Sequence, residues 1–304
     1  QEEHTALLKK IAAAEGRLTE VARTASAEFQ KWAGSDGEIA PAAPIAHFNF
    51  DIVTNNASPS SVSAAVARLD DSPASVEGHE GKALQFSGDN QVTIKGVADF
   101  KRTDAFSFSL WLKPTEAQER AVVLHHSRAW TDSASRGYEL VLDHGKPFFG
   151  LIHFWPGDAI AVRANQELPL NEWSHVVVTY DGSSRANGIR LYLNGAALPV
   201  ETVRDHLTKD IRHRSEWGDA EAGSIHLTLA GRFRDSGFKN GLIDDLQVFD
   251  VALTETEVKA FAGQRTATAE YFLSRKHTPY INALAELKQL REQENALIND
   301  VPEI

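Results

Sequence analysis

The chain has 304 residues, of which 42% are hydrophobic, and its formal net charge is -11. This composition is ordinary for a globular protein and is sufficient for one large core or two small ones. The negative charge disfavours duplex nucleic acid and anionic membrane surfaces as partners, because both would repel the chain. No apolar run approaches the roughly 18 residues that a membrane helix needs, so we expect no membrane insertion.

The chain has no cysteine, which excludes disulfides, thiolate catalysis and cysteine zinc sites. Methionine is also absent, even at position 1, and the N-terminus lacks the basic-then-apolar order of a signal peptide. We therefore expect a processed chain or a fragment of a longer protein, and we favour the fragment.

Residues 1–36 are predicted to form a coiled-coil helix. The apolar positions that define its seam are spaced four and three apart: Leu7, Ile11, Ala14, Leu18, Val21 and Ala25. Glu28 interrupts this register, and Phe29 and Trp32 continue it only after a shift of one residue. The glycines of 34–37 end the helix, and the Pro-rich residues 37–44 are expected to be a linker.

Residues 253–304 are predicted to contain a second long helix. Its apolar stripe repeats the same spacing: Tyr280, Ala283, Leu287, Leu290, Glu294 and Leu297. Pro279 must break or kink any helix that runs into it from Thr266. We expect the two terminal helices to pair as an antiparallel coiled coil, with the intervening region inserted at the tip. The alternative is two unrelated helices that pack on that region or join two chains as a dimer.

Between the helices, over residues 45–252, the apolar period changes from that of a helix to that of a strand. Phe106, Phe108, Leu110 and Leu112 alternate with other residues, as strand side chains on one face do. Asn194-Gly195 is a pair suited to the positive φ angles of a tight hairpin. Since no convincing helix intervenes, the pattern predicts an antiparallel two-sheet jelly-roll sandwich.

Several blocks of this region resemble laminin G-like, concanavalin A-like jelly-roll domains. The blocks, in chain order, are residues 83–88, 106–114, 172–182, 191–195, 241–249 and 252–254. They cover the early strands, the central hairpin and the closing strand of that family. The resemblance implies the same sandwich fold, with carbohydrate-binding and hydrolytic proteins among its relatives.

The helical flanks and residues 299–304 are similar to the surroundings of such a module in large bacterial envelope proteins. Those proteins also carry c-type cytochrome and uncharacterised domains. The resemblance implies that the chain is an insert from such a parent and that it lies outside the cytoplasm, in the periplasm or cell envelope.

Carboxylate pairs are the first requirement for glycoside cleavage. Glu139 and Asp143 are four residues apart without a third acid in register, and Asp244 and Asp245 are adjacent, so a regular strand would place them on opposite faces. We therefore expect no enzyme. A hydrolase would need two carboxylates about 5 to 10 Å apart in a cleft.

Asp244 is a candidate metal ligand. Alternation places it on the face of Leu242, Leu246 and Val248, where an isolated carboxylate is costly to desolvate. In calcium-containing relatives the equivalent Asp and an acid near the first strand hold a structural Ca²⁺, and Asp51 is the matching acid here. The alternative is a salt bridge or a capping hydrogen bond from Asp244 to backbone or an arginine.

Aromatic and basic residues suggest a binding groove. The hydroxyl-rich loop 127–138 carries Arg128, Trp130 and Arg136, and alternation places His153 and Trp155 together, opposite Ile152 and Phe154. Arg232 and Arg234 follow a later strand. Tryptophan offers a stacking plane and arginine a bidentate donor, which suits an acidic or sulfated glycan. The alternative is a covered face, with His153 and Trp155 in a satellite core and the arginines paired with acids such as Asp235.

The function predicted from these features is non-catalytic recognition, with a polysaccharide or glycoconjugate as ligand. The ligand-binding candidates are Arg128, Trp130, Arg136, His153, Trp155, Arg232 and Arg234; the metal candidates are Asp51 and Asp244. A structural or protein-interaction insert, whose groove is filled by the rest of the parent, is the second hypothesis. A glycoside hydrolase is a distant third.

Overall fold

The computed structural model describes residues 2–35, 39–130, 135–213 and 222–301. Part of the expected helix end at 34–37, part of the loop 127–138 and the last three residues of 299–304 lie outside these ranges. The chain divides into two compact units. One comprises Gln1–Ala42 with Leu253–Ile304, and the other comprises Ala43–Ala252.

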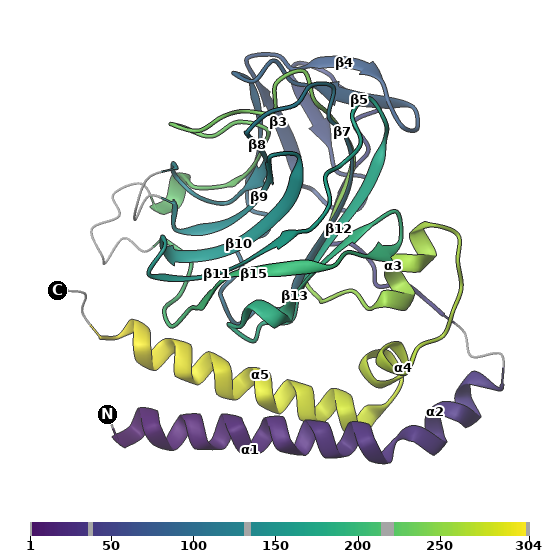
Figure 1. Ribbon diagram of the computed structural model, residues 1–304, viewed down its shortest axis with the longest axis vertical. Helices are drawn as coiled ribbons and strands as arrows, with labels where there is room; N and C mark the ends of the chain where they lie inside the picture. Colours follow the sequence, from purple (N-terminus) through teal and green to yellow (C-terminus); the bar gives the residue numbers. More distant parts are fainter. Residues whose placement is uncertain (1, 36–38, 131–134, 214–221, 302–304) are drawn as a thin grey trace. The chain divides into compact units, whose positions relative to one another are not determined.

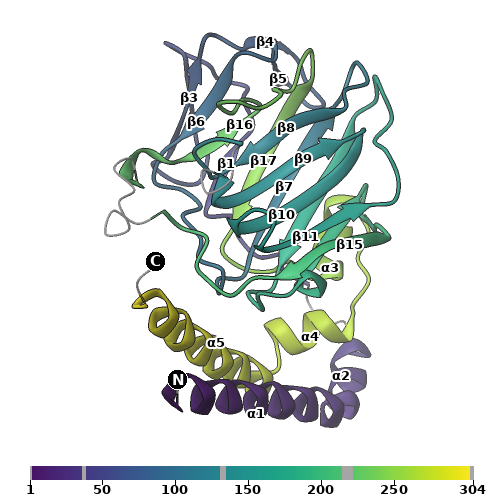
Figure 2. The same cartoon turned by 60° about the vertical axis from the view of Figure 1, so that its left-hand side comes forward.

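Residues Ala43–Ala252 form a sandwich of two antiparallel sheets (Figures 1 and 2). The eight described strands of the first sheet, in spatial order, are β14 (Ala196–Ala197), β13 (Ile189–Leu193), β12 (Ser174–Tyr180), β7 (Phe106–Lys113), β17 (Leu242–Phe249), β5 (Lys82–Gln85) and β4 (Ala74–Glu77), with β1 (Ala46–Phe48) also paired to β17. We call it sheet A.

The nine described strands of the second sheet, which we call sheet B, are β15 (Val200–His206), β11 (Asp158–Ala164), β10 (Lys146–Phe154), β9 (Gly137–Asp143), β8 (Arg120–His125), β16 (Leu227–Leu229), β6 (Gln91–Ile94), β3 (Val66–Asp70) and β2 (Ala57–Pro59). In Figure 2, β8 to β11 lie side by side as one curved surface. The predicted two-sheet sandwich is confirmed.

The core lies between the two sheets. Every second residue of β7, from Phe106 to Leu112, faces the core. Phe108 and Leu110 pair across sheet A with Val178 and Val176 of β12. Because side chains alternate along a strand, the intervening residues of β7 lie on the outer face of sheet A. Trp111 is one of them and is half-buried. The period-two pattern therefore predicts this strand correctly.

The turn between β13 and β14 contains Asn194 and Gly195, with φ angles of 50° and 85°. Two successive positive φ angles match the twist of the flanking strands, and asparagine and glycine adopt them at the least steric cost. The hairpin prediction is confirmed.

The helical unit is built on α1 (Glu2–Thr24) and α5 (Thr278–Asn299). Leu7, Ile11 and Ala14 pack against Leu287, with Leu18 and Leu290 beside them. Ion pairs join Arg17 to Glu286 and Arg291 to Glu15, so the residue numbers fall along one helix as they rise along the other. The helices are therefore antiparallel, as the seam predicts.

The shifted seam marks a break between two helices. The first helix ends at Thr24, and α2 (Ser26–Ala33) carries Phe29 and Trp32 against α4 (Ala269–Arg275). The contacts are aromatic, at centroid distances of 5.9 Å from Phe29 to Phe272 and from Trp32 to Tyr271. The change of register thus corresponds to a change of packing partner.

Local signals set the limits of the C-terminal helices. Thr254 caps α3 (Glu255–Phe261) through a reciprocal capping box with Glu257. Pro279 lies in the first turn of α5, where its missing N–H costs nothing, and it separates α5 from α4 as expected. None of the helices in the described ranges combines the length and the apolarity that a bilayer crossing requires.

Candidate functional site

Two tryptophans lie together on the outer face of sheet B. The rings of Trp130 and Trp155 are 6.0 Å apart, and both side chains are half-buried. Trp155 contacts Phe148 edge-on at 6.1 Å, within a small apolar cluster of Val122, Val141, Phe148 and Ala161. Strand alternation explains this cluster, because Val122, Val141 and Phe148 pair across β8, β9 and β10 and so share one face.

Three arginines lie over these rings. The guanidinium carbon of Arg120 is 4.0 Å from the Trp130 centroid, and that of Arg232 is 5.2 Å from it. Arg204, which is exposed, lies 5.5 Å from the Trp155 centroid. These distances fall within the range of cation–π attraction. We refer to Trp130, Trp155 and the three arginines as the Trp–Arg platform.

The loops that carry the predicted residues meet at this platform. Ala129 and Phe233 form an isolated β-bridge, and the N–H of Trp130 donates to the carbonyl of Phe233 at 3.2 Å. This contact brings the loop with Arg128 beside the loop with Arg234. Both arginines are exposed.

Beneath the platform, two buried carboxylates are paired with two of its arginines. Arg232 bonds Asp235 at 2.9 Å through Nε, and its Nη2 also contacts Glu139. Arg120 bonds Asp235 at 2.8 Å and Glu139 at 3.3 Å. The side chains of Arg232, Glu139 and Asp235 are at most 1% exposed. We call these four residues the Arg–acid network, in which two positive charges balance two negative ones.

The network corrects the expectation that the chain lacks a carboxylate pair. Glu139 Oε2 and Asp235 Oδ2 each lie 2.5 Å from Arg232 Nη2, so they are at most twice that distance apart. This spacing approaches that of a retaining glycosidase. Burial raises the pKa of Asp235, but the bonds and charges of Arg120 and Arg232 outweigh it and lower that pKa overall. Both side chains are excluded from water and paired with arginines.

His125 extends the network. Its Nε2–H donates to the carbonyl of Gly231 at 2.8 Å, because a carbonyl can only accept, and its Nδ1 accepts the N–H of Ser127 at 3.3 Å. Arg232 also donates to the Ser127 hydroxyl at 3.1 Å. Burial lowers the pKa of His125 to about 3, and the charge of Arg232 adds to the effect.

Arg136 and His153 contact each other. Both are buried, and Arg136 Nε donates to the carbonyl of His153 at 3.3 Å, while His153 Nδ1 bonds the carbonyl of Asp210 at 2.6 Å. The expectation that His153 shares a face with Trp155 is wrong, because a register shift between Ile152 and Phe154 interrupts the alternation. These two residues support the fold beside the platform.

Asp244 lies next to a bulge in β17. The pairing with β7 shifts between Asp244 and Gln247, and Asp245 has a φ of 49°. Because of the extra residue, Leu246 and Val248 lie in the core while Asp244 lies on the outer face of sheet A. The prediction that Asp244 shares a face with Leu246 and Val248 is therefore wrong. Asp244 accepts the backbone N–H groups of His79, Glu80 and Asp245 at 2.8, 3.3 and 2.7 Å.

His79 and Glu80 lie in the loop between β4 and β5, and Asp51 holds the other end of this loop. Its Oδ1 accepts the N–H of Lys82 at 2.8 Å, and its Oδ2 accepts the amide of Asn49 at 2.8 Å. Each oxygen of Asp51 and Asp244 therefore already accepts an N–H group, and N–H donors do not coordinate Ca²⁺. Within the described ranges, no group of three or more His, Asp or Glu side chains could hold a metal ion. These contacts are those of the hydrogen-bond alternative, and we therefore expect that the loop needs no calcium.

A calcium titration tests this conclusion. We expect the urea midpoint to be the same in EGTA and in about 5 mM CaCl₂, whereas an ion bound at one hundred times its Kd would add about 2.7 kcal/mol. MgCl₂ at equal ionic strength is the control. A rise specific to calcium, abolished by Asp51→Asn, would restore the metal site.

Comparisons with known proteins agree with this fold. Residues 86–259 match the family described as the concanavalin A-like lectin/glucanases superfamily. No curated protein sequence matches the chain.

The chain is similar to several solved structures. Domain 4 of AbnA, an extracellular arabinanase from Geobacillus stearothermophilus solved with arabinotriose, is 20% identical over 73% of this chain and all of its own, with a TM-score of 0.48. The binding domain of Paraclostridial mosquitocidal protein 1 is 13% identical over 72% of this chain, with a TM-score of 0.51. The receptor-binding domain of botulinum neurotoxin type G is 14% identical over 73%, with a TM-score of 0.49.

The match covers about half, 51%, of each of the two toxin chains. At these identities, the likeness concerns the fold. The family match spans more than half of the chain and includes the closing-strand block on which the sequence resemblance rests. The chain belongs to the concanavalin A-like lectin/glucanase superfamily.

Proposed function

We propose that the sandwich is a non-catalytic carbohydrate-recognition module and that the Trp–Arg platform is its binding site. The observation that carries the proposal is the pair of half-buried tryptophan rings 6.0 Å apart, flanked by arginines. A tryptophan face packs against the apolar face of a sugar ring, and guanidinium groups donate to hydroxyl, carboxylate or sulfate oxygens.

Acidic or sulfated glycans are the favoured ligand class. Arg204 lies exposed beside Trp155, and Arg128 and Arg234 are exposed on the two bridged loops. These side chains bring positive charge to one region of a chain whose net charge is -11. An anionic sugar would gain from this local charge, and added salt would weaken its binding.

The environment of the carboxylate pair beneath the platform supports the non-catalytic assignment. A glycosidase needs one carboxyl group whose raised pKa keeps it protonated, but the arginines lower the pKa of Asp235. Glu139 is fully buried against the same cations. The absence of hydrolysis on any glycan that binds is the matching expectation, and release of reducing ends by the wild type but not by Glu139→Gln would contradict it.

A glycan array with neutral, acidic and sulfated sugars tests the binding site. We expect Trp155→Ala and Arg204→Ala each to weaken binding to the best array ligand by about tenfold or more, as loss of a central aromatic or arginine anchor does. Trp173→Ala is the matched control, because Trp173 lies against His79 and Lys113, outside the platform.

Two outcomes would contradict the proposal. One is the absence of binding to every glycan by a wild-type chain whose urea unfolding is cooperative. The other is binding that Trp173→Ala weakens and Trp155→Ala leaves unchanged, which would move the site to sheet A.

We further propose that the module belongs to a larger extracytoplasmic protein. Both ends of the chain form one helical unit, and the sandwich is inserted between them at Ala43–Ala252. The same observation favours a second candidate, a structural or protein-interaction insert without a glycan ligand. Self-association through the helices would support it, and a chain that stays monomeric at micromolar concentration in light scattering would count against it.

A further inference from the structure

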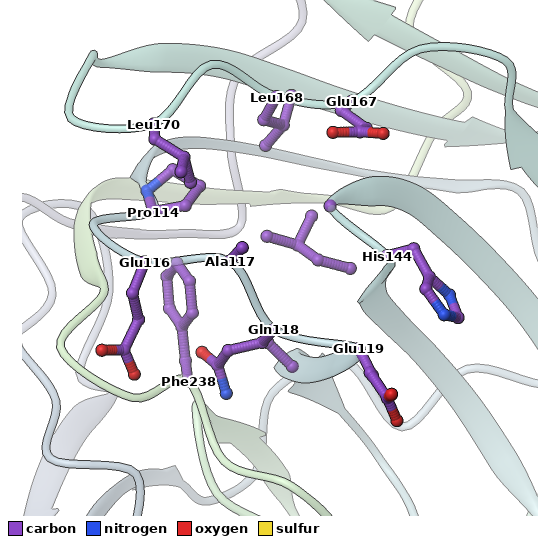
Figure 3. Close-up of a pocket in the computed structure, with 13 residues that line it drawn as sticks. Pro114, Glu116, Ala117, Gln118, Glu119, His144, Glu167, Leu168, Leu170 and Phe238 are labelled. Carbon is purple, nitrogen blue, oxygen red and sulfur yellow. The ribbon is translucent and has the colours of Figure 1, made fainter.

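A separate pocket lies at one end of the sandwich, where four connections converge. They are the β7–β8 loop, the β9–β10 turn, the β11–β12 loop and the β16–β17 loop. Its volume is about 360 Å³, which is in the range of small-molecule sites. Figure 3 shows the pocket, with side chains from these connections around a common hollow. It shares no residue with the Trp–Arg platform.

The interior of the pocket is apolar. Pro114, Leu168, Leu170 and Phe238 surround it, with Leu142 from the end of β9. Leu170 is 44% exposed. A ligand with an apolar group would remove this surface from water and gain about 25 cal/mol per Å².

The rim of the pocket is acidic. Glu116, Glu119 and Glu167 surround the hollow in Figure 3, and none of the described residues that line it is a lysine or an arginine. Glu116 is already paired with Lys239 at 3.3 Å. Glu119 and Glu167 are exposed and make no ion pair with another described residue, so their charges are available to a ligand.

His144 completes the rim and bonds residues beside it. Its ring Nδ1 bonds Asp143 at 2.9 Å, and its backbone N–H donates to the carbonyl of Glu119 at 2.8 Å. The second bond fixes the loop that carries Glu119 against the β9–β10 turn. The rim therefore holds two carboxylates, Glu119 and Glu167, on two different loops on either side of the β9–β10 turn (Figure 3).

We propose that this pocket binds a small organic cation, namely an ammonium or guanidinium group attached to an apolar group. The apolar part enters the hollow among Leu168, Leu170 and Phe238, and the cation lies between Glu119 and Glu167. Neutral ligands lose the charge attraction, and anions are repelled.

The test is a titration of the full chain with phenethylammonium, followed by amide chemical shifts in NMR. We expect saturable shifts in residues of the four connections with a Kd of about 1 mM, which is typical of so small a ligand. The neutral analogue 2-phenylethanol should bind at least about fivefold more weakly, and 3-phenylpropionate should not bind, because the rim attracts only cations. Raising the salt should weaken phenethylammonium binding.

Variants locate the site. Glu167→Gln and Glu119→Gln should each weaken binding about threefold to tenfold, since each removes one rim charge from an exposed position. Ala117→Phe should block the hollow without changing the charge. Glu77→Gln, on the exposed surface of β4, is the matched control and should leave the Kd unchanged.

N-acetylphenylalanylarginine amide distinguishes two sources of the cation. Tighter binding than phenethylammonium would indicate a side chain of a protein partner, and weaker binding would indicate a free amine. Equal affinity for 2-phenylethanol, or a Kd that both Glu→Gln variants leave unchanged, would overturn the proposal. Because the glycan array reports on different residues, either proposal can fail without the other.

Discussion

Acidification from pH 7 to pH 5 is expected to destabilise the sandwich by several kcal/mol, because three histidines are buried there as neutral rings. Burial lowers the pKa of His125 to about 3 and that of His126 and His175 to about 4. His125 is held between Gly231 and Ser127, and His175 bonds the Ser109 hydroxyl at 2.8 Å. To become charged, His125 would have to give up the hydrogen bond that its Nδ1 accepts from the N–H of Ser127.

The direction of the effect follows from proton linkage. The unfolded chain protonates these histidines near pH 6.5, whereas the folded chain keeps them neutral to about pH 4. Their stabilising contribution is therefore complete above pH 6.5 and is lost as the pH falls toward 4. Asp244 acts in the opposite sense, because burial raises its pKa to about 6 and the folded state holds its proton more tightly.

Between about pH 4 and pH 6, unfolding thus takes up three protons at histidines and releases one at Asp244. A net uptake of about two protons corresponds to roughly 3 kcal/mol per pH unit. The lowered pKa values of Asp235 and Asp245 add to the loss at the acidic end of this range.

The measurement is the free energy of unfolding by urea, followed by tryptophan fluorescence between pH 5 and pH 7.5. His175→Gln should reduce the slope by about 1.4 kcal/mol per pH unit, the value for one proton. His206→Gln is the control, because His206 is exposed on β15 and should leave the slope unchanged. A free energy that stays constant from pH 7 to pH 5 would show that these rings are accessible to protons in the folded state.

Patterns that depend only on neighbouring residues predicted the fold well. The alternation of Phe106 to Leu112 and the Asn194-Gly195 turn are both local, and each has one strong structural solution. The seam of Leu7, Ile11 and Ala14 also predicted its partner, because the C-terminal stripe had the same spacing.

Register defects account for the side chains that were misplaced. Single bulges at Asp245 and near Ile152 reverse the face of every residue beyond them, so alternation put Asp244 beside Leu246 and His153 beside Trp155. A bulge has a weak sequence signal unless a glycine marks it. At Asp245 the φ angle is positive, and the sequence around an aspartate does not predict such an angle.

The candidate site was predicted only in part. Trp130, Trp155 and Arg232 were expected together, and the structure brings them together. Arg120 and Arg204 were missed because nothing local distinguishes them from surface arginines. The carboxylate pair was missed because Glu139 and Asp235 are far apart in the sequence, so the pair exists only after β9 and the β16–β17 loop meet.

Removal of Arg232 is expected to be the most damaging single change in the sandwich. Arg232→Met should lower the free energy of unfolding by about 3 to 5 kcal/mol, because it leaves Glu139 and Asp235 buried with the charge of Arg120 alone. Methionine fills a similar volume, so the loss would report the missing charge and its hydrogen bonds more than a cavity.

Two controls isolate the cause. Lys239→Ala breaks an exposed ion pair with Glu116 and should cost at most about 1 kcal/mol. Adding Glu139→Gln to Arg232→Met should recover part of the lost free energy of unfolding. In the single variant Glu139 has only the 3.3 Å contact with Arg120, so removing its charge relieves an almost unpaired buried carboxylate. Asp235 keeps its 2.8 Å bond to Arg120.

The same variant has a second readout in the pH profile. The charge of Arg232 helps to lower the pKa of His125, so Arg232→Met should raise that pKa and reduce the loss of stability on acidification. If Arg232→Met cost no more than Lys239→Ala and kept the wild-type pH slope, water would have to reach the carboxylates. The Arg–acid network would then be an open, solvated cluster in which Glu139 or Asp235 could serve as a general acid.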